Sequence, residues 1–148
     1  MNHEIVSKNA LFTMSLGEKF SHLISKGSTI CFTGDLGAGK TTFIRGIAKG
    51  LNIKETVQSP TFNIMKIYLK GDCPLIHIDA YRLEDINQDI GLDEYIGYET
   101  GITVIEWPQF IEKLLPKNYI KIDIKNLGDD KRKISFLGIE NDIWEKIK

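Results

Sequence analysis

The chain has 148 residues, of which 42% are hydrophobic and 26% charged, and its formal net charge at pH 7 is -1. This length suits a single domain over residues 1–148, and the composition is that of soluble globular proteins. The small net charge argues against a whole-surface electrostatic grip on nucleic acid. Without a long apolar run or a secretory signal pattern, we expect a cytoplasmic protein with no membrane span.

The first third of the sequence predicts a helix, a strand and a second helix. Apolar residues recur at helical spacing from Phe12 to Ile24 and stop before Gly27, as in a helix that ends at a glycine. The segment 29–33 (TICFT) is short, β-branched and apolar, which is typical of a buried strand. Apolar residues from Phe43 to Leu51 then mark one face of a second helix.

The rest of the chain continues to alternate between the two kinds of element. Runs typical of strands occupy residues 62–69, 75–81, 102–107, 119–125 and 133–139. Helices are expected over 83–95 and 108–116, with a short one at the end of the chain. This alternation predicts an α/β fold of three layers, with a largely parallel core sheet and antiparallel late strands. A ligand should lie beyond the carboxyl ends of the core strands.

The segment GDLGAGKTT, from Gly34 to Thr42, contains the pattern G-x-x-x-x-G-K-[ST] between an expected strand and an expected helix. Its small residues let backbone N–H groups close around phosphate oxygens, and the helix N-terminus adds partial positive charge. Lys40 can reach the outer phosphates, and the Thr41 hydroxyl can ligate a magnesium ion that bridges them. The sequence therefore predicts a nucleotide site of the P-loop NTPase type.

A P-loop needs an acidic partner for its metal, and two carboxylates end apolar strands. These are Asp79, after LIHI, and Glu106, after ITVI. His77 shares a strand face with Asp79, and we interpret it as a strand residue that hydrogen-bonds near Asp79, since magnesium prefers oxygen donors. For Trp107, next to Glu106, packing and contact with a nucleotide base both stay open.

The choice of nucleotide and the rate of turnover are inferred from what the sequence lacks. It has no NKxD-like guanine-reading tetrapeptide and no DxxG after an apolar strand, so ATP with Mg²⁺ is expected. The basic cluster 131–133 is interpreted as a solvated hairpin edge. None of the arginines, Arg45, Arg82 and Arg132, lies in an obvious finger loop, which predicts slow hydrolysis that a partner accelerates.

Five motifs, in this order, closely resemble the TsaE family, formerly YjeE. They are GDLGAGKTT, SPTF (59–62), HIDAYRL (77–83), GLDEY (91–95) and VIEWP (104–108). The resemblance extends to about Pro116. It implies a bacterial P-loop ATPase that is needed to form threonylcarbamoyladenosine in tRNA. It also implies docking on a dimer of the TsaD and TsaB proteins, with tRNA contacted only through that complex.

The resemblance also implies roles for individual residues. The nucleotide contacts it implies are Thr13, Asp35, Leu36, Gly37, Ala38, Gly39, Lys40, Thr41, Thr42 and Trp107. The metal-linked residues it implies are Thr41, Asp79 and Glu106, and the two carboxylates form the catalytic set together with Lys40. A switch-like segment falls on Ser59, Pro60, Thr61 and Phe62, which ATP would order around its terminal phosphate.

Two other functions stay open from the sequence. An ATP-gated assembly subunit, in which turnover is incidental, would use the same residues as an ATPase. A small-molecule kinase would need an acceptor pocket and usually a basic lid, for which three arginines offer little.

Overall fold

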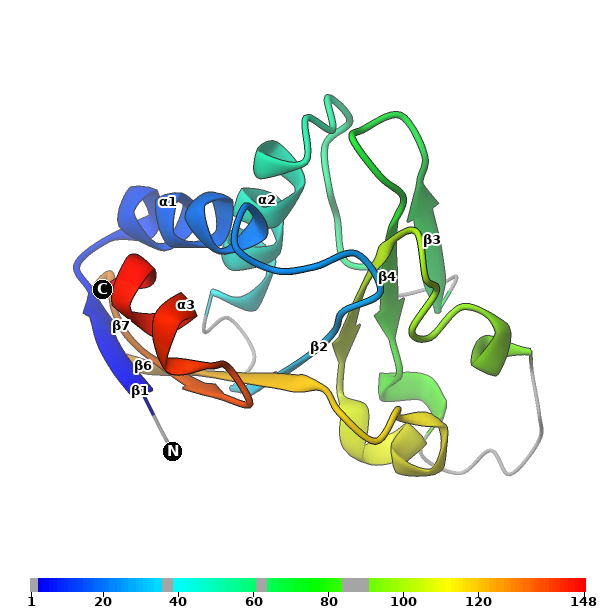
Figure 1. Cartoon of the computed structure of the whole chain (residues 1–148). Helices are drawn as coiled ribbons and strands as arrows, with labels where there is room; N and C mark the ends of the chain where they lie inside the picture. Colours follow the sequence, from blue (N-terminus) through cyan, green and yellow to red (C-terminus); the bar gives the residue numbers. More distant parts are fainter. Residues whose placement is uncertain (1–2, 36–38, 61–63, 84–90) are drawn as a thin grey trace.

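The computed structural model describes residues 3–35, 39–60, 64–83 and 91–148, which form one seven-stranded sheet in the order β1-β7-β6-β2-β5-β4-β3 (Figure 1). The strands are β1 His3–Ser7, β2 Thr29–Gly34, β3 Met65–Tyr68, β4 Leu75–Asp79, β5 Ile102–Glu106, β6 Ile120–Gly128 and β7 Lys131–Leu137. Strands β6, β2, β5 and β4 run parallel, whereas β7, β1 and β3 are antiparallel to their neighbours. The expected α/β fold, with a parallel centre and antiparallel late strands, is confirmed.

The helices α1 Ala10–Ser21, α2 Lys40–Gly50 and α3 Asn141–Ile147 pack against one face of the sheet, where α1 and α2 lie close together (Figure 1). Aromatic side chains fill this core: the ring centroids of Phe20 and Phe43 are 5.8 Å apart, and those of Phe43 and Phe136 are 6.1 Å apart. The 3₁₀ helices η1 Tyr81–Leu83, η2 Leu92–Glu94 and η3 Pro108–Leu114 contribute to a second core on the other face. No helix within the described ranges is long and apolar enough to cross a bilayer.

The register of the parallel strands places the ends of β4 and β5 side by side. Asp79 and Glu106 are paired positions at these ends, and Phe32 of β2 is paired with Glu106 on its other side. The chain leaves β2 two residues later at Gly34, where the predicted P-loop begins. Because parallel strands end at one edge, the loop and both carboxylates meet there.

Two glycines let α1 and α2 cross in close contact. A β-carbon on Gly46 would overlap the carbonyl oxygen of Met14, and one on Gly17 would overlap that of Phe43. We expect Gly46→Ala to lower the free energy of unfolding by about 1–3 kcal/mol, measured by urea denaturation, because the helices must separate to admit the methyl group. Ser15→Ala, at an exposed position of α1, is the control and should change it by less than about 0.5 kcal/mol. Equal effects of the two changes would contradict the tight crossing.

The helix expected over 108–116 is not an α-helix. Its residues form the 3₁₀ helix η3, and Ile111 interrupts it with φ -135°. Trp107 precedes it in a left-handed conformation, and Ile111 is buried in the second core. An apolar segment this short has little helical stability of its own, so tertiary packing decides its conformation.

Other boundaries also differ from the sequence prediction. The first helix ends at Ser21, although Leu23 and Ile24 still pack against the core. Of the strand expected over 62–69, residues 62 and 63 lie outside the described residues, and β3 begins at Met65, directly after Ile64 with φ 63°. Of the helix expected over 83–95, residues 84–90 lie outside the described residues, and the flanking segments form η1 and η2.

Strand β1 has no counterpart in the sequence prediction. It is an edge strand of only five residues, HEIVS, that pairs with β7. A strand this short and polar obtains its stability from its partner rather than from its own pattern.

Candidate functional site

Two glycines bracket the predicted phosphate loop between β2 and α2. Gly39 has φ 104° and forms the N-cap of α2, and Gly34 has φ 129° with no room for a β-carbon beside the carbonyl group of Ile124. Both positions therefore require glycine. Asp35 is exposed, whereas Leu36, Gly37 and Ala38 of the predicted loop lie outside the described residues.

Lys40, the first residue of α2, is buried at the base of this loop. Its side chain Nζ donates to the carbonyl oxygen of Gly34 at 3.1 Å and lies 4.8 Å from the ring centroid of Trp107. An aromatic face and one carbonyl group satisfy a buried ammonium only in part, since it carries three donors. Among the described residues, Lys40 therefore has donors left over that could bind an anion, and its contact with phosphate stays a prediction. The next two residues, Thr41 and Thr42, are half-buried in the first turn of the helix.

Asp79 and Glu106 lie within reach of one hydroxyl group. The Oγ atom of Ser59 is 3.1 Å from Asp79 Oδ2 and 3.1 Å from Glu106 Oε2. The other oxygen of Asp79 accepts a hydrogen bond from the backbone N–H of Tyr81 at 3.0 Å. The structure thus brings the first residue of the predicted switch segment to both predicted metal-linked carboxylates. Pro60 is buried beside it, and Thr61 and Phe62 lie outside the described residues.

The side chain of His77 contacts Glu106. The sequence interpretation had expected its hydrogen bond to lie near Asp79. Its Nε2 atom lies 2.8 Å from Glu106 Oε2. His77 is paired across the sheet with Val104, so Glu106 is its diagonal neighbour on the same face. The correction follows from strand register, which the sequence of one strand does not contain.

The surroundings of Glu106 favour its ionised form. Burial acts to raise the pKa of Glu106, but the hydrogen bonds from His77 and Ser59 and the positive charge of Lys40 outweigh burial, and the pKa lies below its usual value. Glu106 is therefore an anion at neutral pH and can accept hydrogen bonds or ligate a cation.

Trp107 connects Lys40 to an aromatic cluster. Its φ of 59° turns the chain sharply after β5, and its ring stacks on Phe110 with centroids 6.0 Å apart and lies 5.0 Å from the ring of Tyr81. The sequence left packing and a contact role open for this residue. The structure shows that it packs and that it also lies against the lysine of the phosphate loop.

A small cavity of about 40 Å³ lies on the Thr42 side of the loop. It is lined by Ala10, Thr13, Gly39, Thr42, Asp130 and Arg132. Thr13 is buried, and its hydroxyl group lies 2.6 Å from that of Ser7. The structure therefore places Thr13 in one cavity with Gly39 and Thr42, and the nucleotide contact that the resemblance implies stays a prediction.

Arg132 was missed by the sequence interpretation of residues 131–133 as a solvated hairpin edge. Lys131 is exposed and Lys133 pairs with Glu4, but the Nε atom of Arg132 lies 3.6 Å from the place where a β-carbon of Gly39 would be. Arg132 also donates to the side chain of Asn126. No local sequence signal places this hairpin beside the loop, because β6 pairs with β2 about 90 positions away along the chain.

The donor set at the edge of the sheet suits magnesium. The described residues contain no group of three or more His, Cys, Asp and Glu side chains that could enclose a metal ion. Magnesium in nucleotide sites is usually held by one or two carboxylates together with phosphate oxygens and water. Thr41, Asp79 and Glu106 are oxygen donors of this kind, so they could hold the ion with a nucleotide.

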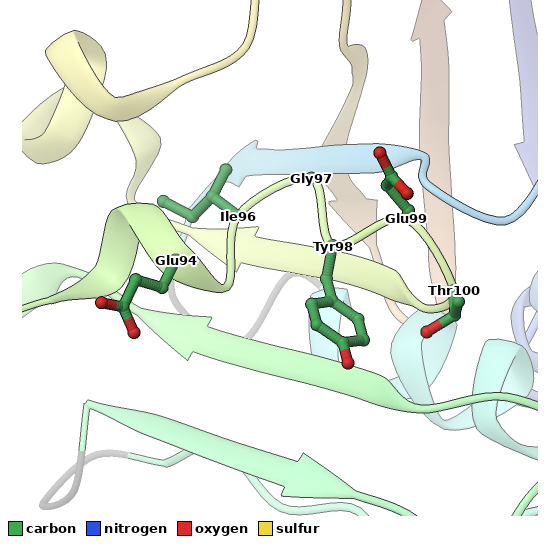
Figure 2. A pocket seen from close by; sticks show the side chains of 6 residues that line it. All are labelled: Glu94, Ile96, Gly97, Tyr98, Glu99 and Thr100. Carbon is green, nitrogen blue, oxygen red and sulfur yellow. The ribbon is translucent and has the colours of Figure 1, made fainter.

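A second hollow of about 340 Å³ lies along residues 94–100 (Figure 2). It follows the segment that leads into the amino end of β5, with Glu94, Tyr98 and Glu99 at its surface. None of the predicted site residues lines it. The carboxyl edge of the sheet remains the candidate site.

Similarity to known proteins identifies the family of this chain. The family model described as "Threonylcarbamoyl adenosine biosynthesis protein TsaE" matches residues 7–134. The chain belongs to the TsaE family. A "tRNA threonylcarbamoyladenosine biosynthesis protein TsaE" of Bacillus subtilis is 44% identical over 129 residues, which cover 87% of this chain and 81% of that protein. The protein of the same description from Treponema pallidum is 39% identical over 132 residues, covering 88% and 96%.

A solved structure shares the fold of this chain. The crystal structure of YdiB from Bacillus subtilis superposes with a TM-score of 0.81 at 34% sequence identity, over 99% of this chain and 94% of that one. The resemblance of the five motifs to the TsaE family is thereby confirmed, and so is the fold that it implied.

Proposed function

We propose that the chain binds and slowly hydrolyses ATP in support of threonylcarbamoyladenosine formation in tRNA, by acting on a complex of the TsaB and TsaD proteins. The observation that carries this proposal is the meeting of Lys40, Asp79 and Glu106 at the edge where parallel strands end. Membership of the TsaE family supports the pathway.

Different residues of the chain would bind the phosphates, the metal ion and the rest of the ATP molecule. The first backbone N–H groups of α2 and the ammonium of Lys40 would bind the phosphates. Thr41, Asp79 and Glu106 would ligate Mg²⁺, which when bound supplies neutralisation of the charge that develops on the phosphoryl oxygens. Thr13 and Thr42, which line one small cavity beside the loop, would contact the edge of the bound ligand.

The positions of the arginines support slow turnover by the isolated chain. Arg45 donates to the carbonyl oxygen of Val57, and Arg132 lines the cavity with Thr13 and Thr42 instead of meeting Glu106. Arg82 is exposed just after β4. A positive charge supplied from outside to the terminal phosphate would raise the rate strongly, because an arginine finger contributes about a thousandfold or more.

The deciding experiment measures phosphate release from ATP by the purified chain, with and without the TsaB and TsaD proteins, and with GTP as a control. We expect slow release by the chain alone and at least a tenfold acceleration by the two partners together. Equal turnover with and without them would contradict their action on this site. Equal use of GTP would contradict the choice of ATP.

A second function, an ATP-gated assembly subunit, is supported by the position of Ser59. This residue opens the predicted switch segment and touches both carboxylates. A metal ion bound to Asp79 would compete with Ser59 for Oδ2, so occupancy of the site would change the contacts of the first residue of the predicted switch segment. The Glu106 variant described in the Discussion separates this function from the ATPase.

A further inference from the structure

His77 is a buried polar residue in a strand whose other core positions are apolar. It is fully buried in β4, between β3 and β5, in the sequence LIHID. Its Nε2 atom is bound to Glu106, but its Nδ1 atom is buried with no hydrogen-bond partner among the described residues. An unpaired buried ring nitrogen costs stability relative to an apolar side chain of similar size. Packing alone therefore does not account for a histidine here.

The hydrogen bond to Glu106 has a defined direction. An ionised carboxylate only accepts, so the proton in the 2.8 Å contact belongs to Nε2 of His77. Ser59 Oγ approaches the same carboxylate oxygen, Oε2, at 3.1 Å. Both hydrogen bonds that described residues make to the Glu106 carboxylate are thus to Oε2, and none of these residues donates to Oε1. Within this part of the chain, one oxygen is held and the other accepts no hydrogen bond.

Asp79 is held in a different way. One of its oxygens accepts from the backbone N–H of Tyr81 and the other from Ser59, so the main chain itself restrains this short side chain. Glu106 has one more rotatable bond and no such backbone donor among the described contacts. A longer side chain loses more rotamer freedom when it is fixed, and it needs a dedicated partner to be fixed.

We propose that His77 is a positioning residue of the metal site: its Nε2–H group binds Oε2 of Glu106 and leaves Oε1 for the metal or a metal-bound water. The inference rests on the proposed function, because it takes Glu106 as a metal-linked residue. It assigns to the histidine of the HIDAYRL motif a role that requires no contact with nucleotide or metal. Partners that orient a metal ligand in this way typically change metal affinity by about 10- to 100-fold when removed.

Three variants separate the hydrogen bond from the bulk of the side chain. His77→Leu removes the donor and replaces the ring with an apolar side chain. His77→Gln carries an amide N–H group at about the reach of Nε2. His77→Asn is polar but too short to reach Glu106, and it replaces His77→Leu should the leucine variant not fold.

The measurement is the affinity for Mn²⁺, used as a paramagnetic substitute for Mg²⁺, in the presence of a non-hydrolysable ATP analogue and followed by electron paramagnetic resonance. We expect His77→Leu and His77→Asn to weaken Mn²⁺ binding by about 10- to 100-fold and His77→Gln to restore it to within about threefold of the unmodified chain. The affinity for the analogue in EDTA should be the same in all variants, because the side chain of His77 contacts Glu106 rather than Lys40 or the described residues of the predicted phosphate loop. A purely structural role would change the urea midpoint without this metal-specific pattern.

The outcomes separate an error in the role of His77 from an error in the proposed function. If the unmodified chain binds Mn²⁺ with the analogue and His77→Leu binds it equally well, the positioning role is wrong and the proposed function stands. Equal weakening in His77→Leu and His77→Gln would also overturn the role, because the donor would then be irrelevant. If the unmodified chain binds neither analogue nor Mn²⁺, the proposed function and the role of His77 are both wrong.

Discussion

Replacing Lys40 by alanine is expected to lower the affinity for ATP by about 100-fold or more. The Lys40 ammonium is buried at the base of the loop, and its recorded contacts are the carbonyl group of Gly34 and the face of Trp107. A hydrogen bond to a charged group contributes about 1.5–3 kcal/mol, and each 1.4 kcal/mol is a tenfold change in affinity. A lysine that reaches two phosphates loses more than one such bond. Isothermal titration calorimetry with ATP and Mg²⁺ measures the loss.

Lys49→Ala is the matched control. Lys49 lies on the same helix, is exposed, and pairs with Glu18 at 3.9 Å, a surface contact of little energetic value. Its removal should leave the ATP affinity within about twofold. Unchanged affinity in Lys40→Ala would place the nucleotide away from the loop, and equal losses in both variants would point to a general effect of positive charge.

The candidate phosphate loop could be located from the sequence because its functional groups are contiguous, and its binding of phosphate stays a prediction. The pattern fixes where backbone N–H groups, a lysine and a hydroxyl group occur within nine residues, and a strand before it and a helix after it follow from local periodicity. Asp79 and Glu106 could be predicted for a related reason: each ends an apolar run, and parallel strands end at one edge. The register that pairs these two residues confirms their proximity.

The contacts that the sequence did not reveal join residues far apart in the chain. His77 meets Glu106 through the diagonal register of two neighbouring strands. Arg132 lines a cavity together with Gly39 because a late hairpin extends the sheet beside β2. Neither residue has a distinctive pattern around it, so composition suggested an ordinary strand histidine and a solvated basic edge. Pairing between strands, rather than the character of any one strand, completes this site.

The same reasoning explains which elements were misjudged. The residues of η3 carry a helical apolar pattern, but the left-handed Trp107 before them and the buried Ile111 within them impose a tighter and broken helix. Long periodic segments such as α2 have enough local signal to resist such effects. Short segments take the conformation that their packing requires.

Glu106→Gln is expected to leave ATP binding within about threefold of the unmodified chain and to slow hydrolysis by about 100-fold or more. The amide keeps the size of the side chain and an acceptor for His77, but it loses the negative charge that the site is built to maintain. The phosphates are bound mainly by the loop and Lys40, so affinity should survive. A metal held less firmly gives less stabilisation of the developing charge, an effect worth several kcal/mol. Calorimetry and phosphate release measure the two quantities.

Glu112→Gln is the control, since Glu112 is an exposed carboxylate on η3 and should alter neither quantity. Normal magnesium-dependent turnover in Glu106→Gln would remove Glu106 from the mechanism. The same variant also separates turnover from gating when it is added to a reconstituted tRNA modification with the TsaB and TsaD proteins. If it binds ATP and its partners but fails to support modification, hydrolysis itself is required. If it supports modification normally, occupancy of the site and the response of the Ser59 segment are sufficient, because only binding has then been preserved.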